Sequence, residues 1–351
     1  MIVVTGAYGF IGSCLIGFLN ERGITDIIAV DDFSKTEKEP NLVGKQITQR
    51  IERETFIQWF GENALPSSRD RLSVSFIFHI GARTDTTEFD YAIHEKLNVQ
   101  FSKDVFNICE KYSIPLIYAS SAATYGNGEL GYDDHDPSVS FDLQPLNPYG
   151  VSKNEFDKWV ISQQAMGDIK QLTTQNSIPS TRDETQNLHW FGLKFFNVYG
   201  PNEYHKGRMA STIFHFFNQI NAQGEVNLFK SHRPDYADGE QMRDFVYVKD
   251  VLKVIWFLYQ NYDKVHSGLY NLGTGKARPF NDLVKNVFKN VDKPLKTNYI
   301  PTPEDIRDKY QYFTEANMDK LHTEGYDEKF YSLEEGIEDY VQNYLKLKKY
   351  Y

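Results

Sequence analysis

The residues best suited to chemistry in this sequence are Tyr149 and Lys153, four positions apart at the expected start of a helix. That spacing brings a phenol and an ammonium onto one helical face. A tyrosine with the ordinary pKa of about 10 is a poor base at neutral pH, but a nearby cation favours the phenolate. Ser121 directly follows a predicted strand whose carboxyl end should face the same crevice. These three side chains predict a group that takes and returns the proton of a hydroxyl.

A second set of residues is suited to holding a diphosphate. Gly6, Gly9 and Gly12 recur every third residue between an expected strand and an expected helix. Glycine allows a tight turn and a close approach of backbone N–H groups to a pyrophosphate at a helix N-terminus. The next expected strand ends in Asp31 and Asp32, where an acidic side chain can accept hydrogen bonds from an adenosine ribose. The sequence therefore predicts a bound dinucleotide.

Short apolar runs alternate with longer amphipathic ones over the first 200 residues, which indicates βα units and a parallel sheet. We expect strands at residues 2–4, 27–30, 76–79, 116–119 and 191–195. We expect helices at residues 10–22, 91–112 and 149–164, and an amphipathic helix at 333–347. Residues 163–187 are rich in Gln, Thr, Ser and Asp and are interpreted as a surface insertion.

These elements predict an α/β fold, a Rossmann doubly wound parallel sheet with a smaller C-terminal substrate-binding lobe. We expect residues 1–200 to form the dinucleotide-binding domain. Residues 201–351 should form mainly the substrate-binding lobe, with some elements returning to the Rossmann body.

Composition limits the classes of function. The net charge of -10 over 351 residues gives no basic field for nucleic acid or an anionic membrane. No apolar run approaches the ~20 residues that span a bilayer, and the N-terminus lacks the pattern of a signal peptide. The two cysteines, Cys14 and Cys109, are too few for a disulfide framework or a multi-cysteine metal site. We expect a cytoplasmic protein with buried, reduced thiols and no metal.

Together, the glycine triplet, residues 120–126 (SSAATYG) and the Tyr-x-x-x-Lys pair resemble the extended short-chain dehydrogenase/reductase family of nucleotide-sugar enzymes. Residues 195–201 (FFNVYGP), 205–211 (HKGRMAS) and 243–248 (RDFVYV) are most similar to the ADP-L-glycero-D-manno-heptose 6-epimerases of that family. The resemblance extends from residue 1 to about residue 340.

The resemblance implies oxidation of an ADP-heptose at C6, followed by reduction of the ketone from its other face by the same cofactor. Tyr149 would be one acid/base, with Lys153 lowering its pKa and Ser121 hydrogen-bonded to the reacting oxygen. Lys206 would be the second acid/base, or alternatively a loop cation that neutralises phosphate. The family forms homo-oligomers, which implies the same here.

The resemblance also assigns binding residues. The cofactor would contact the glycine loop, the ribose-binding acids, their neighbouring cations and the loop after residue 79: Gly6, Gly9, Phe10, Ile11, Gly12, Asp31, Asp32, Lys38, Arg53, Ile80, Gly81, Ala82, Arg83, Thr84, Asn98, Lys153, Val198 and Lys206. The substrate would contact Asn197, Arg208, His215, Phe229, Lys230, Ser231, His232, Arg243 and Tyr310. The two histidines could instead be packed or solvated side chains.

Several alternatives stay open. We expect NADP as the cofactor, because Lys38 and Arg53 could neutralise a 2′-phosphate, but Asp31 would repel one and favour NAD. Lys194 stands where an arginine is expected. A 4,6-dehydratase needs an acid/base pair where this sequence has Ala122 and Ala123. A UDP-hexose 4-epimerase would share the core residues, whereas a non-catalytic dinucleotide sensor should lack the tyrosine or the lysine.

Overall fold

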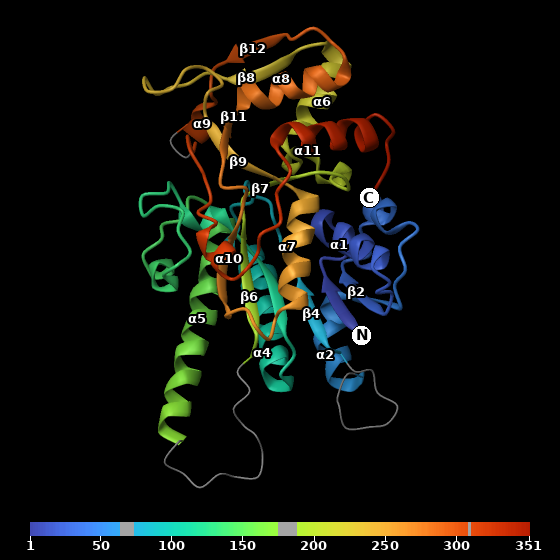
Figure 1. The fold of residues 1–351 in the computed structure, drawn as a ribbon, viewed down its shortest axis with the longest axis vertical. Coiled ribbons are helices and arrows are strands. Elements are labelled where there is room, and N and C mark those ends of the chain that lie inside the picture. Colours follow the sequence, from blue (N-terminus) through green and yellow to red (C-terminus); the bar gives the residue numbers. More distant parts are fainter. Residues whose placement is uncertain (64–73, 175–187, 308–309) are drawn as a thin grey trace.

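The computed structural model describes residues 1–63, 74–174, 188–307 and 310–351. A parallel sheet with flanking helices fills one end of the molecule, and a smaller group of helices and short strands from the C-terminal half covers the other end (Figure 1).

The sheet has seven strands in the order β10-β6-β5-β4-β1-β2-β3, and all neighbours are parallel. Its strands are β1 (Ile2–Thr5), β2 (Ile27–Asp31), β3 (Gln49–Glu52), β4 (Phe76–His79), β5 (Leu116–Ser121), β6 (Trp190–Phe195) and β10 (Gly268–Leu272). Val3 and Val4 of β1 belong to two different buried apolar clusters. Both faces of the sheet are therefore covered, as a doubly wound fold requires, and the predicted fold class is confirmed.

The helices on the sheet are α1 (Phe10–Glu21), α2 (Arg53–Asn63), α3 (Tyr91–His94), the π-helical η2 (Glu95–Gln100), α4 (Phe101–Tyr112), α5 (Pro148–Thr174) and α7 (Val248–Gln260). The helices predicted at residues 10, 91 and 149 begin close to those positions, whereas α2 and α7 were not predicted. The predicted end of the helix at residue 164 is wrong, because α5 continues to Thr174. The first part of the expected insertion is thus helical, since Gln, Ala, Met and Leu there favour a helix. Residues 175–187 lie outside the described residues.

The remaining elements lie mostly after residue 196. They are β7 (Asn197–Tyr199), β8 (Val226–Phe229), β9 (Met242–Tyr247), β11 (Ala277–Pro279), β12 (Thr297–Ile300), α6 (Thr212–Gln223), α8 (Phe280–Val291), α9 (Glu304–Arg307), α10 (Asp319–Thr323) and α11 (Leu333–Tyr340). The short 3-10 and π segments are η1 (Thr36–Leu42), η3 (Ala122–Tyr125), η4 (Pro137–Phe141), η5 (Tyr204–Met209) and η6 (Val341–Leu345). The C-terminal half contributes β10 and α7 to the sheet body, and α7 packs on α1.

The predicted C-terminal helix is present as α11 and η6. Ser332 caps it through a capping box with Glu335. The chain then crosses to α1 (Figure 1), where the backbone N–H of Tyr351 donates to the side-chain oxygen of Asn202 at 2.8 Å. This segment therefore fixes the loop that follows β7.

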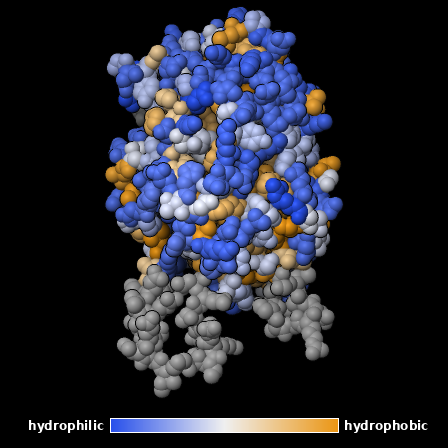
Figure 2. Space-filling view, in the orientation of Figure 1, coloured by the Kyte–Doolittle hydropathy of each residue, from blue (hydrophilic) through white to orange (hydrophobic). Residues whose placement is uncertain are grey.

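The face shown in Figure 2 is mostly hydrophilic, with apolar side chains in small, separate patches. Among the described residues, no helix has the length and apolar character needed to cross a membrane. Cys14 and Cys109 are both buried and free.

Candidate active site

The glycine loop between β1 and α1 is packed too closely to admit side chains. A Cβ at Gly6, whose φ is +68°, would lie 2.4 Å from the Cα of Gly81, and one at Gly12 would lie 2.1 Å from the carbonyl oxygen of Gly6. Gly9 is the N-cap of α1, and no side chain caps the helix. The first N–H groups of α1, from Phe10, Ile11 and Gly12, are therefore available to a diphosphate, and the loop fits a dinucleotide.

Acidic and basic side chains gather at the carboxyl end of β2. Asp31 accepts a hydrogen bond from the backbone N–H of Tyr8 at 2.9 Å, and its other oxygen lies 3.7 Å from Nζ of Lys38. A hydrogen bond from Ser34 is the main reason that the pKa of Asp32 is lowered, and the charge of Arg53 contributes. The structure thus brings together Asp31, Asp32 and Lys38, which the resemblance assigns to the adenosine ribose, and places Arg53, which it assigns to the adenine side, near Asp32.

The loop from Ile80 to Thr84 follows β4 and lies against the glycine loop. The N–H of Ile80 donates to the carbonyl of Thr5 at 3.3 Å. Asn98 binds both backbone groups of Arg83, at 2.7 and 3.0 Å, and donates to Ser152 on α5 at 3.0 Å. Asn98 therefore connects this loop to the helix that carries Tyr149 and Lys153, while the side chains of Arg83 and Thr84 are exposed.

Tyr149, Lys153 and Ser121 meet where the first turns of α5 pass the end of β5. The phenol of Tyr149 lies near the Ser121 hydroxyl, which acts to lower its pKa. Lys153 is 2 % exposed, and its ammonium donates to the carbonyl of Ala119 at 2.8 Å. The spacing in the sequence therefore correctly predicts that these side chains lie together.

The pKa of Tyr149 is raised in this structure, whereas the sequence predicted that a nearby cation would lower it. Burial raises the pKa of Tyr149, the hydrogen bond from Ser121 opposes that rise, and the charge of Asp157 adds to it. Burial also lowers the pKa of Lys153 to about 8, against the opposing charge of Asp157. The protein alone thus holds Tyr149 in its neutral form, and a lowered tyrosine pKa stays a prediction for the complex with the cofactor.

Lys206 lies in η5, and its Nζ is 5.2 Å from the ring centroid of Phe10 at the start of α1. The half-buried amine has a lowered pKa because of burial, opposed by the charge of Glu203. Glu203 is fully buried and binds Ser211 and Tyr340, so this loop is held at both ends. Lys206 therefore faces the loop that fits the dinucleotide.

A cavity of about 400 Å³ is lined by residues from both halves of the chain, including two of the predicted substrate residues, His232 and Tyr310. The ring of Phe229 packs against that of Tyr310 at 6.0 Å, and Tyr312 binds Ser231 and His232. Lys230 is exposed and next to them in the chain.

Arg243 is close to the same cavity. Its guanidinium stacks on Tyr310 at 5.5 Å and donates to the carbonyls of Met242 and Gln311. Only 8 % of Arg243 is exposed, and two of its guanidinium nitrogens already donate hydrogen bonds to backbone carbonyls of the protein.

The other predicted substrate residues, Asn197, Arg208 and His215, do not line this cavity. Nε2 of His215 is 3.2 Å from the carbonyl oxygen of Arg208. The charge of Arg208 contributes to the low pKa of Asp85, which places this arginine near the loop after β4. Asn197 is exposed and Val198 half-buried on β7.

Comparison with known proteins identifies the family. Residues 2–273 match the family model described as the NAD dependent epimerase/dehydratase family. The chain belongs to this family. A relative from Fusobacterium nucleatum, named ADP-L-glycero-D-manno-heptose-6-epimerase, is 44% identical over 98% of both chains.

Further relatives carry the same name. One from Nitratidesulfovibrio vulgaris is 44% identical over 98% of both chains. The crystal structure of the Helicobacter pylori ADP-L-glycero-D-manno-heptose-6-epimerase matches with a TM-score of 0.73 and 27% identity, over 97% of this chain and 95% of that one. This member of the epimerase/dehydratase family is therefore an epimerase with a nicotinamide dinucleotide cofactor, and a catalytic function is favoured over the non-catalytic alternative.

Sequence reasoning missed several members of the site in this epimerase. Asp157 continues the Tyr149–Lys153 face by one more turn of α5, so its spacing was a usable signal. Further cavity-lining residues come from separate loops: Asn127, Gly128, Tyr132, Arg233, Tyr236, Arg307, Gln311, Tyr312 and Phe313. The only sequence signal for these cavity-lining residues was the two-residue spacing of Tyr310 and Tyr312.

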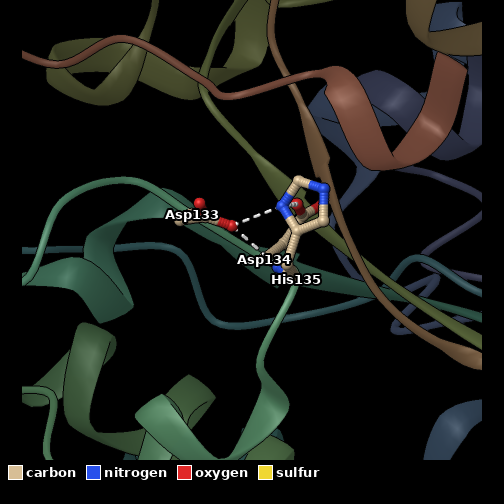
Figure 3. Close-up of side chains that lie close together, drawn as sticks. All are labelled: Asp133, Asp134 and His135. Carbon is tan, nitrogen blue, oxygen red and sulfur yellow. Dashed lines mark hydrogen bonds and ion pairs between the residues drawn. The ribbon is translucent and has the colours of Figure 1, made fainter. Parts of the chain in front are cut away.

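One cluster with metal-binding residue types lies apart from these motifs. Asp133, Asp134 and His135 bring their ligand atoms within 4.8 Å of one another (Figure 3). His135 binds Asp133 at 2.6 Å, and Asp134 accepts from the backbone N–H of Asn271 on β10 at 2.6 Å. These contacts join the loop before η4 to the edge of the sheet, and we assign the cluster that structural role.

Proposed function

We propose that this epimerase inverts C6 of ADP-D-glycero-D-manno-heptose to give ADP-L-glycero-D-manno-heptose for lipopolysaccharide synthesis. The C6 hydroxyl would be oxidised to a ketone and then reduced from its other face. The nicotinamide, when bound, accepts the hydride and returns it.

The observation that carries this proposal is that two proton-handling groups lie at the carboxyl edge of the parallel sheet, one after β5 and one beside the glycine loop after β1. Tyr149 lies near Ser121, one helical turn from Lys153, and Lys206 faces Phe10 at the start of α1. Inversion presents the sugar to the nicotinamide in two orientations, and a separate acid/base can serve each one.

In this mechanism Tyr149 removes the proton from the hydroxyl in one orientation, and Lys206 gives a proton to the ketone oxygen in the other. Proton exchange with solvent then restores both groups to their starting forms. Ser121 orients the reacting oxygen, and Lys153 supplies positive charge beside the phenol. Burial lowers the pKa of Lys206 and so brings its amine closer to the range in which it can exchange a proton at neutral pH.

The rest of the substrate is held by binding residues in two groups. The side chains of Arg243, Tyr310, His232, Ser231, Lys230 and Phe229 bind the ADP part, where guanidinium and aromatic groups suit a diphosphate and a base. Asn197, Arg208 and His215 bind the sugar side.

We infer that NADP is the cofactor, since the cations Lys38 and Arg53 adjoin the acids at the end of β2. Residues 1–200 supply the cofactor domain and residues 201–351 most of the substrate lobe. The enzyme acts as a cytoplasmic homo-oligomer, which light scattering of the purified protein would test.

The first test offers ADP-D-glycero-D-manno-heptose and, in parallel, UDP-glucose to the holoenzyme and follows both epimers by NMR. We expect turnover of the ADP-heptose alone, and turnover of UDP-glucose alone would refute the assignment. Tyr149→Phe should lower kcat by at least ~10²-fold with the fold intact by circular dichroism.

A second test separates a base from a phosphate-neutralising cation at Lys206. Lys206→Arg keeps the positive charge but cannot give up a proton near neutral pH. If Lys206 is an acid/base, both Lys206→Arg and Lys206→Met lose kcat with little change in KM. A nearly normal kcat in Lys206→Arg, with a raised KM only in Lys206→Met, would overturn the two-base mechanism.

An analogue with an aldehyde at C6 of the sugar tests whether Tyr149 and Lys206 are separate acid/base groups. In its dismutation one molecule of the aldehyde is oxidised and another is reduced. A single mutant should still transfer hydride in this reaction although it no longer epimerises the natural substrate.

A further inference from the structure

We propose that Asp157, held by Lys194, is a positioning residue for the Tyr149–Lys153–Ser121 group. The inference rests on the proposed function only in taking Tyr149 as the acid/base. Neither Asp157 nor Lys194 touches the reacting atoms in this proposal.

Asp157 lies on the same face of α5 as the catalytic pair. Tyr149, Lys153 and Asp157 are spaced four residues apart, so all three point from the helix toward the sheet. Asp157 is fully buried, and its carboxylate accepts hydrogen bonds from Tyr118 at 3.0 Å and Ser120 at 2.6 Å, both on β5. The carboxylate thus attaches α5 to the strand that ends in Ser121.

Lys194 on β6 completes this attachment. Its side chain is 2 % exposed, and the ammonium lies 3.0 Å from the Asp157 carboxylate and donates to Thr124 of η3 at 2.8 Å. Lys194 is paired with Ser120 in the register of β5 and β6. The sequence showed only that a lysine stands here in place of an arginine, whereas the structure gives it three elements to join.

The pair holds the backbone segments that carry Tyr149, Lys153 and Ser121. Ser120 precedes Ser121, and Thr124 donates in turn to the carbonyl of Ser121 at 2.8 Å. A buried charge is costly unless it is paired, so loss of either partner must disturb this arrangement. A displacement of about 1 Å at a catalytic group can lower a rate by ~10²-fold.

The negative charge of Asp157 also acts on the chemistry. It raises the pKa of Tyr149 and opposes the lowering of the pKa of Lys153. Other titratable or charged groups near these side chains are His79 and Tyr118 on the sheet, His94 of α3, Tyr125 of η3 and Lys194. Removing the charge of Asp157 should therefore shift proton transfer to lower pH.

The test compares Asp157→Asn, Lys194→Met and Lys194→Arg with a matched control, Lys253→Met. Lys253 is also a lysine 3.0 Å from a fully buried aspartate, Asp250, but on α7. We expect Lys194→Met to lose ~10-fold or more in kcat with KM changed less than about threefold, and Lys194→Arg to recover most of it. Lys253→Met should lose thermal stability but keep kcat.

The pH dependence of kcat in Asp157→Asn separates an electrostatic role of Asp157 from a purely structural one, because loss of a structural contact alone would not shift it. The limb of the kcat profile that reports deprotonation of the acid/base should shift to lower pH by roughly half a unit or more. The proposal would be overturned if kcat of Asp157→Asn were lower at every pH without a shift of the limb. It would also be overturned if Lys194→Met, like Lys253→Met, lost stability but kept kcat.

A substrate-free measurement separates failure of this proposal from failure of the proposed function. Ring-¹³C-labelled tyrosine in the holoenzyme with oxidised cofactor gives the titration of Tyr149, assigned by the signal lost in Tyr149→Phe. If the wild type does not turn over ADP-heptose, the function is wrong, yet a lower titration midpoint in Asp157→Asn still supports the role of Asp157. An unchanged midpoint refutes that role.

Discussion

Substituting Gly12 by alanine tests whether the spacing of the glycine loop determines cofactor affinity. The new Cβ would lie 2.1 Å from the carbonyl oxygen of Gly6 and 2.7 Å from its carbonyl carbon, both backbone atoms that no rotamer change can move. Ordinary contact begins near 3.4 Å, so the start of α1 and the loop must separate by roughly 1 Å.

This separation should lower both the affinity for the dinucleotide and the free energy of unfolding. Moving the N–H groups of α1 by about 1 Å should weaken one or two charge-assisted hydrogen bonds to the diphosphate, each contributing about 1.5–3 kcal/mol. We therefore expect the Kd for the dinucleotide to rise by ~10- to 100-fold or more. Strain in the loop should cost about 1–3 kcal/mol of unfolding free energy, partly offset by about 0.5–1 kcal/mol from the better helix propensity of alanine.

Gly17→Ala in the same helix is the matched control. A Cβ there would meet only the ends of the Lys45 and Tyr351 side chains, at 3.2 and 3.6 Å. It gains the same helix propensity without touching the loop. Calorimetric titration with NADP and urea unfolding of both variants separate the two effects, and a Gly12→Ala protein that binds NADP like Gly17→Ala would refute the reasoning.

Three other outcomes are expected. Burial lowers the pKa of His79 to about 3, against 6.5 for an ordinary histidine, so the unfolded chain takes up this proton first and the unfolding free energy falls as the pH drops from 6.5 toward 3. His79→Gln should flatten that part of the profile in urea unfolding at stepped pH, and an unchanged slope would contradict it. Lys38→Ala should raise the Kd for NADP by ~10-fold or more and that for NAD far less, and equal losses for both would remove Lys38 from cofactor choice. Product formed in deuterated water should carry no deuterium on carbon by mass spectrometry, whereas its incorporation would favour deprotonation over hydride return.

The parts of this enzyme that the sequence predicted are those with strong local patterns. The strands around Val3, Ile28 and Ile117 are continuous apolar runs because both faces of the sheet are buried. The glycine triplet and the Tyr149–Lys153 spacing also depend on neighbours within a few residues. Such features need no knowledge of the distant chain.

The parts that escaped prediction depend on contacts between distant segments. In β3 only Ile51 is buried, because an edge strand needs just one apolar side, so its pattern was too weak to recognise. β8 and β12 pair in parallel although about 70 residues separate them, as the register Val226↔Thr297 shows. Likewise, Lys194 was only an odd residue in a motif until β5, η3 and α5 were seen around it.

The position of β10 has a consequence for how this chain is made. Residues 268–272 pair with residues 191–195, so the strand that closes one side of the sheet is synthesised more than 70 residues after its partner. While a ribosome extends the chain through that interval, β6 has an open edge that exposes the backbone groups β10 will later pair. Such an edge invites pairing between nascent chains, so crowded polysomes and rapid overexpression should favour aggregates unless a chaperone covers it. A fragment ending near residue 200 would keep that open edge permanently, and the first half should therefore be expressed together with residues up to at least 272.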